Sequence, residues 1–202
     1  MRQARTARTR ARLVAAARDT LVEVGLAGAA TAAIAARAGV SHGALFRHFP
    51  TKPDLLAAAV QAILADLVVG FGEDLGRDPG RDPVGAAVAA LWRVFRRPDM
   101  RVVLEIYVAA RTEPALAERL APILDRHQAT ILAEARRLFP VEAAANPELD
   151  DAVLAVVYAM QGAAVGLFSP DPAHEVAHLG FLERLARREL ARRPVRYPPV
   201  GE

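Results

Sequence analysis

The stretch from His42 to His48 holds residues whose types and order suit contact with DNA. Gly43 and Ala44 stand near its beginning, and Arg47 and His48 stand at its end. Small residues allow a helix to approach the base edges in a major groove, whereas cations attract phosphate groups. The chemistry expected of this stretch is therefore nucleic-acid binding.

A second group of residues has the spacing of metal ligands. His174, Glu175 and His178 match H-E-x-x-H, a pattern in which two histidines one helical turn apart bind Zn²⁺ and the glutamate activates water. The pattern is short, and Phe181 and Arg184 stand where its longer form requires Gly and His. An ordinary helix start explains the same residues, because a glutamate there interacts favourably with the helix dipole. A helical zinc hydrolase remains the alternative function from a different class.

Two short helices joined by a tight turn are expected to position the DNA-contacting stretch. Thr31 is the expected N-cap of the first helix, and Gly39 lies in the turn, where glycine adopts a positive φ without steric cost. Ser41 is the expected N-cap of the second helix. Pro50 ends that helix, and Thr51 can cap the next one. The apolar residues expected to face inward are Ile34, Ala35, Ala38, Leu45, Phe46 and Phe49.

Residues 31–56 read TAAIAARAGVSHGALFRHFPTKPDLL. This segment resembles the helix-turn-helix of the TetR family of bacterial transcription regulators. The resemblance implies that DNA phosphates are contacted from Thr31, Phe46, His48 and Lys52. It places the base-reading positions at Ala32, Ser41, His42, Gly43 and Ala44.

Two residues depart from the family pattern. Phe46 stands where many members carry Tyr, so a hydroxyl that would reach a phosphate is lost. Ala32 offers no polar atom to a base, which leaves fewer residues to specify the DNA sequence. His42 is then the only long polar side chain at the start of the second helix.

The net charge of +3 conceals an uneven distribution. Residues 1–52 hold nine cations and two acids, a net charge of +7, and residues 53–202 carry a net charge of −4. A basic end on an acidic body is the charge distribution expected of a nucleic-acid binder, although a solvated charged tail is the plainer explanation. The chain has no cysteine, which excludes disulfides and thiolate metal sites.

The composition predicts an all-α protein, because 53% of the residues are apolar but only 5% are aromatic. A core built largely from Ala, Leu and Val favours helices over strands. We expect about nine helices: the helix-turn-helix pair at about 31–49 and others at about 9–24, 53–71, 84–96, 100–111, 114–139, 149–168 and 173–192. Residues 70–83 and 140–147 are expected loops. The expected domains are a DNA-binding domain (1–52), an effector-binding and dimerisation domain (53–193) and a disordered tail (194–202).

Residues 152–168 form an uncharged apolar run of 17 residues, at the lower limit for a membrane helix. Gln161 and several small residues within the run favour instead a helix buried in a core or a subunit interface. The TetR resemblance implies that this helix and the following one pair with their copies in a second subunit as a four-helix bundle. An ordinary monomer core is the alternative.

Large or polar side chains on the predicted helices of residues 84–168 suggest a ligand-binding site. Small-molecule sites are mostly apolar with a few fixed polar groups, although aromatic residues at helical spacing are more often plain core. The candidate pocket residues are Trp92, Phe95, Tyr107, Tyr158 and Gln161.

The sequence as a whole indicates a cytoplasmic, non-enzymatic regulator, acting as a repressor. It is expected to bind a palindromic double-stranded DNA operator as a homodimer, with no cofactor, and to release it when a small apolar ligand binds. A DNA-binding protein without an effector is a further alternative.

Overall fold

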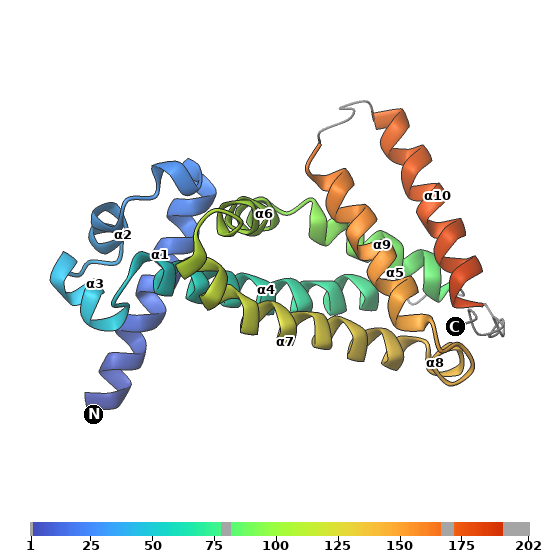
Figure 1. Ribbon diagram of the computed structural model, residues 1–202, viewed down its shortest axis with the longest axis horizontal. Helices are drawn as coiled ribbons and strands as arrows, with labels where there is room; N and C mark the ends of the chain where they lie inside the picture. The colour runs from blue at the N-terminus through green and yellow to red at the C-terminus, as the bar shows by residue number, and fades with distance from the viewer. Residues whose placement is uncertain (1, 78–81, 167–171, 192–202) are drawn as a thin grey trace, which may run out of the picture. The chain divides into compact units, whose positions relative to one another are not determined.

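The computed structural model describes residues 2–77, 82–166 and 172–191. Every regular element within these ranges is a helix, as the all-α prediction requires (Figure 1). In chain order the helices are α1 (Arg2–Gly28), α2 (Thr31–Arg37), α3 (His42–His48), α4 (Lys52–Arg77), α5 (Pro83–Phe95), α6 (Pro98–Ala110), α7 (Pro114–Leu138), α8 (Pro140–Ala145), α9 (Leu149–Ala164) and α10 (Pro172–Leu190).

The chain divides into two compact units. The first unit comprises residues 1–70 and 96–127, and the second comprises residues 71–95 and 128–202. The long helices α4 and α7 each contribute to both units. The first unit therefore contains the three N-terminal helices together with α6 and parts of α4 and α7, and the DNA-binding boundary at residue 52 stays a prediction.

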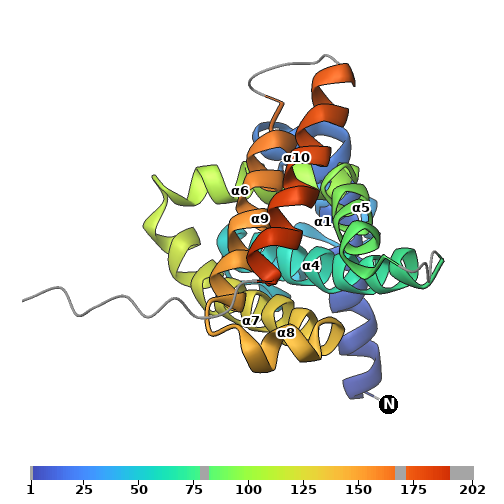
Figure 2. The same cartoon turned by 90° about the vertical axis from the view of Figure 1, so that its right-hand side faces the viewer.

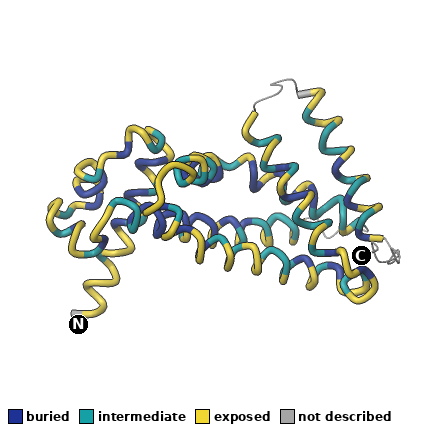
Figure 3. Tube along the Cα trace, in the orientation of Figure 1, coloured by how far each residue is buried: buried dark blue, intermediate teal, exposed yellow. Residues whose placement is uncertain are grey.

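The core of the first unit begins with α1. Leu13, Ala17 and Leu21 follow one another at helical spacing and are all buried. Val24, expected on the same face, is 50% exposed, and Gly25 at φ 68° and ψ 179° interrupts the helix directly after it. The first part of α4 is also largely buried (Figure 3). Among the described residues α4 alone has the length and apolar composition of a membrane span, and 56% of its apolar window is buried inside the protein.

The second unit is built around α5, α9 and α10, which pack on one another (Figure 2). Phe139, Leu149 and Leu190 form a buried cluster at the base of these helices. The buried Asn146 fixes the approach to α9, because its amide donates to the carbonyl oxygen of Glu189 at 2.7 Å. An apolar cluster and a satisfied polar group thus join the end of α10 to the start of α9.

Two expected loops are partly helical. Residues 70–77 continue α4, because Leu67, Phe71 and Leu75 keep one apolar face at four-residue spacing. Residues 140–145 form α8, where Pro140 opens the helix and Glu142 lies in its first turn, both favourable positions. The first helix also begins near residue 2 rather than residue 9. The expected end of α9 at residue 168 and the tail at 194–202 lie outside the described residues.

Candidate nucleic-acid interface

The first helix of the helix-turn-helix begins differently from the prediction. Ala30, not Thr31, is the N-cap of α2, and its carbonyl oxygen accepts from the amide of Ile34 at 3.1 Å. Thr31 is the first helical residue, and its hydroxyl lies 3.0 Å from Nε2 of His42 on α3. The Thr31 hydroxyl therefore links the two helices instead of capping one of them.

The turn between α2 and α3 depends on Gly39, as predicted. Its φ of 63° lies in the left-handed region, and the next amide, of Val40, donates back to the carbonyl oxygen of Ala35 at 3.0 Å. From α1, the guanidinium of Arg12 donates to the carbonyl oxygen of Ala38. A Cβ atom at Gly39 would lie 2.8 Å from Nη2 of Arg12. The turn is thus held by its own hydrogen bonds and by an arginine from α1.

The inner face of α3 is narrower than expected. Ser41 caps the helix as predicted, since its hydroxyl accepts from the amide of Ala44 at 3.2 Å. Leu45 and Phe49 are buried, but Phe46 is 37% exposed, so its predicted inward orientation is wrong. One step along a helix turns the side chain by about 100°, so adjacent residues such as Leu45 and Phe46 do not both face the core.

The outer face of α3 presents most of the predicted DNA-contacting residues. His42, Gly43 and Arg47 are exposed, and Ala44 and His48 are half-buried. A Cβ atom at Gly43 would have no neighbour within 4 Å, so the backbone at this position is open to a close partner. This face has the size and polarity that major-groove contact requires.

Two contacts hold the His42 side chain in place. Its ring packs edge-on against Phe46 with the ring centroids 4.9 Å apart and an interplanar angle of 86°. Its Nε2 atom is the one paired with the Thr31 hydroxyl. The structure therefore brings together one predicted base-reading residue and two predicted phosphate-contacting residues.

The start of α4 holds Lys52 and, two residues later in the sequence, one member of an ion pair. Thr51 caps the helix, as predicted: its hydroxyl accepts from the amide of Asp54 at 3.2 Å, and its own amide donates to the Asp54 carboxylate at 3.0 Å. Nε of Arg119 donates to the same carboxylate at 2.7 Å. The Thr51 hydroxyl, followed by Arg119, lowers the pKa of Asp54 below its usual value. Lys52 makes no ion pair with any described residue.

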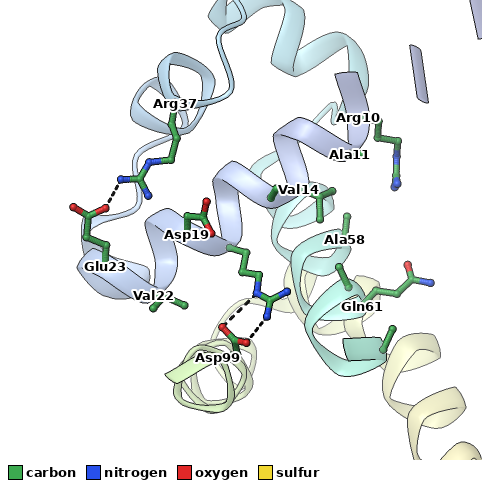
Figure 4. Close-up of a pocket in the computed structure, with 14 residues that line it drawn as sticks. Arg10, Ala11, Val14, Asp19, Val22, Glu23, Arg37, Ala58, Gln61 and Asp99 are labelled. Carbon is green, nitrogen blue, oxygen red and sulfur yellow. Dashed lines mark hydrogen bonds and ion pairs between the residues drawn. The ribbon is translucent and has the colours of Figure 1, made fainter. Parts of the chain in front are cut away.

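Two of the N-terminal cations are neutralised inside the first unit. Arg18 on α1 pairs with Asp66 on α4 and with Asp99 on α6, and Arg37 pairs with Glu23. Figure 4 shows the pairs of Asp99 and of Arg37 with Glu23. Arg18 with Asp99, and Arg37 with Glu23, line an open groove, and half of the other lining residues are alanines of α1 and α4. The cations of residues 3–52 that have no carboxylate partner in the described part of the chain are Arg5, Arg8, Arg10, Arg12, Arg47 and Lys52.

Several positioning residues were missed in the sequence. Asp54 had a readable signal, because an acid three residues after Thr51 completes a capping box. Arg18 and Asp99 had none, since 81 residues separate them in sequence. Arg12, which holds the turn, resembled any other cation of a basic segment.

The glutamate of the predicted zinc motif forms a hydrogen bond with a tryptophan side chain. Glu175 accepts a hydrogen bond from Nε1 of Trp92 at 3.0 Å. No group of three or more metal-ligating side chains occurs among the described residues. The carboxylate that a zinc hydrolase would use to activate water instead joins α10 to α5.

The predicted ligand residues fall in both units. Tyr107 belongs to the first unit, where burial raises the pKa of its phenol to about 12. Trp92 and Phe95 are buried on α5 in the second unit. On α9, Gln161 is half-buried, whereas Tyr158 is 57% exposed. Their role in ligand binding stays a prediction.

Comparison with known proteins identifies the family. Residues 13–59 match the family described as bacterial regulatory proteins, tetR family. The chain is 36% identical over 186 residues to an HTH-type transcriptional regulator of Mycobacterium tuberculosis, Rv2912c, an alignment covering 91% of this chain and 95% of that protein. The chain belongs to the TetR family. It is a TetR-type transcriptional regulator with a DNA-binding helix-turn-helix, and it is not an enzyme.

Solved structures of similar sequence share the TetR fold. A transcriptional regulator from Rhodococcus sp. Rha1 is 27% identical with a TM-score of 0.64, and the match covers 90% of this chain and 93% of that one. The multidrug binding protein EbrR, in complex with imidazole, is 25% identical with a TM-score of 0.60, and the match covers 93% and 96%.

Proposed function

We propose that this TetR-family regulator is a cytoplasmic repressor that binds a palindromic operator as a homodimer and leaves it when a small apolar ligand binds. The observation that carries the proposal is the outer face of α3. His42, Gly43 and Arg47 are exposed there, while Leu45 and Phe49 fix the opposite face in the core. A helix held in this way can enter the major groove as a rigid element.

Contacts with DNA divide into two kinds in this proposal. His42 reads a base edge at the start of α3, next to the open backbone of Gly43. Arg47, His48 and Lys52 bind phosphates, with Thr31 and the exposed edge of Phe46 closing the same surface. Phosphate contacts fix the register on the duplex, whereas the base contact supplies sequence preference.

Exposed apolar residues on α9 and α10 support the homodimer. The residues Ala155, Tyr158 and Gly162 of α9 and its C-cap Val165 recur every three or four positions and are all exposed. On α10, Val176 and Phe181 are exposed as well. An uncharged stripe on α9, with exposed apolar side chains on the neighbouring α10, suits burial against a second copy of the same helices.

The effector has weaker support. The related EbrR structure contains imidazole and is described as multidrug binding, and this chain carries Trp92 and Phe95 in the interior of its second unit. A ligand there would release DNA only if it bound the two arrangements of the dimer with different affinities. The alternative is a DNA-binding regulator whose packed core accepts no ligand.

Selection from random DNA tests the central proposal. The full-length protein is incubated with a pool of random 30-base-pair duplexes, and bound sequences are amplified and read. An inverted repeat with half-sites about one helical turn or a multiple apart is expected. Recovery of no preferred sequence, or of a single unrepeated site bound by a monomer, would contradict it.

A ligand screen tests the effector. Imidazole and a panel of larger apolar aromatic compounds are added while Trp92 fluorescence and release of the selected duplex are recorded together. We expect a compound that binds to weaken DNA affinity about 5- to 150-fold. Gln161→Leu should alter that response and leave ligand-free DNA binding unchanged. Compounds that alter Trp92 fluorescence without changing DNA affinity would instead favour the alternative without an effector.

A further inference from the structure

The first turns of α1 project beyond the hydrophobic core. Leu13 is the first buried residue among those whose burial is described, and Arg5 and Arg8, which precede it, are exposed. Asp19 is the first acidic residue in the sequence, so no carboxylate lies within this part of the helix. The guanidinium groups of Arg5 and Arg8 form no ion pair with any described residue. Two turns of helix thus carry unneutralised positive charge without contributing to the core.

The direction of these arginines follows from Arg12. Arg5, Arg8 and Arg12 are spaced by three and four residues, so they share one face of α1. Arg12 uses that face to hold the turn between α2 and α3. Arg8 and Arg5 therefore lie on the same face of α1 as Arg12, one and two turns nearer to its N-terminal end.

A second contact places the same part of α1 near the end of α3. The guanidinium carbon of Arg10 lies 4.9 Å from the ring centroid of Phe49, the residue that follows α3. Arg10 and Arg12 thus attach α1 to both sides of α3, and the helix continues past them without interruption. The seven residues from Arg12 back to Arg5 span about 10 Å, the length of about three base pairs along a DNA strand.

We propose that Arg5 and Arg8 bind phosphate groups of the DNA just outside the half-site that α3 reads. The proposal rests on DNA binding by α3 and extends it to a second element of the same unit. Arginine side chains on one helix face, without competing carboxylates, suit the negative charge of the DNA backbone. The extension of α1 strengthens binding and leaves base preference to α3.

Salt dependence is the first test. The Arg5→Ala/Arg8→Ala double variant is compared with wild type on a duplex selected by wild type, at 50 to 200 mM salt. Each lost phosphate contact lowers the slope of log affinity against log salt by about 0.9. The double variant should therefore lose about tenfold less affinity than wild type over this range, and circular dichroism should show the same fold. An unchanged slope in the double variant overturns the proposal.

A matched control removes two exposed arginines elsewhere in the first unit. Arg101 and Arg111 lie on α6 and at its end, and neither has an ion-pair partner among the described residues. Arg101→Ala/Arg111→Ala changes the net charge by the same amount. Its slope should stay within error of wild type, and a decrease equal to that of the Arg5/Arg8 variant would show a general charge effect and overturn the proposal.

Two further arms separate this inference from the proposed function. Removing five base pairs from each end of the selected duplex should weaken DNA binding by wild type and leave the affinity of the Arg5→Ala/Arg8→Ala variant unchanged.

The Arg5→Lys/Arg8→Lys variant should keep the wild-type salt slope, because a phosphate contact requires only the positive charge. A salt slope equal to that of the alanine variant overturns the phosphate assignment. Failure of wild type to bind any duplex contradicts the proposed function, whereas binding that is indifferent to flanking DNA contradicts this inference alone.

Discussion

The helix-turn-helix and the surface of α9 and α10 are both exposed, yet their chemistry is opposite. The first surface presents His42, Arg47 and Lys52 beside an open backbone. The second presents Ala155, Tyr158, Gly162 and Val165 at helical spacing, with the exposed Val176 and Phe181 on the next helix. Unpaired cations are well solvated in water and bind phosphates favourably. Exposed apolar side chains instead lower the free energy when they are buried away from water. The difference supports the proposal that the first surface meets DNA and the second meets another subunit.

The largest effect should come from a charge placed on the apolar surface. Phe181→Glu introduces a carboxylate at a side chain that is 54% exposed in the isolated chain. We expect monomers, and a loss of operator affinity of about 10²- to 10⁴-fold, because the second half-site would no longer bind intramolecularly. Analytical ultracentrifugation and gel-shift titration measure the two outcomes.

A neighbouring residue provides the contrast for this test. Leu182 is only 2% exposed, so a charge there would disrupt the subunit's own core and says nothing about the interface. Phe181→Glu should keep the helical content and thermal stability of wild type. A Phe181→Glu protein that remains dimeric would show that this apolar surface is not the dimer interface.

The second effect separates base reading from phosphate binding on the charged surface. His42→Ala should cost about 1–3 kcal/mol on the selected operator and little on random DNA. Lys52→Ala should weaken both and lower the salt slope by about one unit. Titration of each variant against both duplexes is the measurement. Equal losses on the two duplexes for both variants would refute the division of roles.

The third effect compares two glycines of the helix-turn-helix. Gly39→Ala places a Cβ in a left-handed backbone and 2.8 Å from Nη2 of Arg12, so the free energy of unfolding should fall by about 1–2 kcal/mol. Gly43→Ala meets nothing within 4 Å on α3, and alanine is the better helix former, so stability should be retained or increased. Urea denaturation measures this difference.

The operator affinity of Gly43→Ala should not follow its stability. The extra methyl of Gly43→Ala stands on the surface that faces the groove, so operator affinity should fall without loss of stability. A Gly43→Ala variant with wild-type affinity would show that this part of α3 does not approach the bases closely.

Local chemistry was the part of this molecule that the sequence predicted well. The Gly39 turn, the Ser41 and Thr51 caps and the all-helical fold each follow from a few neighbouring residues. Thr31 was misjudged because its hydroxyl contacts His42, eleven residues away, rather than its own helix.

Long-range partners were beyond the reach of the sequence. Arg18 with Asp99, and Trp92 with Glu175, join helices more than 80 residues apart. Their side chains carry no local periodicity or capping signal that distinguishes them from other surface charges. The glutamate of the zinc-like motif illustrates this point, because only its position in space reveals the indole that it binds.

The smallest effect concerns the one acid beside the predicted phosphate contacts. Asp54 is ionised at neutral pH, with a pKa lowered first by the Thr51 hydroxyl and then by Arg119. Its contribution to stability is therefore present above the unfolded pKa of about 3.9 and lost as the pH falls through the lower folded pKa. Asp54→Asn should cost about 0.5–1 kcal/mol at pH 7, and the difference from wild type should shrink below about pH 4.

DNA binding gives the same pair a second, sharper test. Arg119→Ala leaves the Asp54 carboxylate without its ion-pair partner, two residues after Lys52 in the sequence. We expect its charge to repel the phosphate that Lys52 binds, so operator affinity should fall by a few-fold. Adding Asp54→Asn to that variant removes the repelling charge and should restore most of the affinity. Gel-shift titration of the single and double variants measures the coupling. If the double variant binds no better than Arg119→Ala, Arg119 acts by packing alone, and the charged surface extends no further than Lys52.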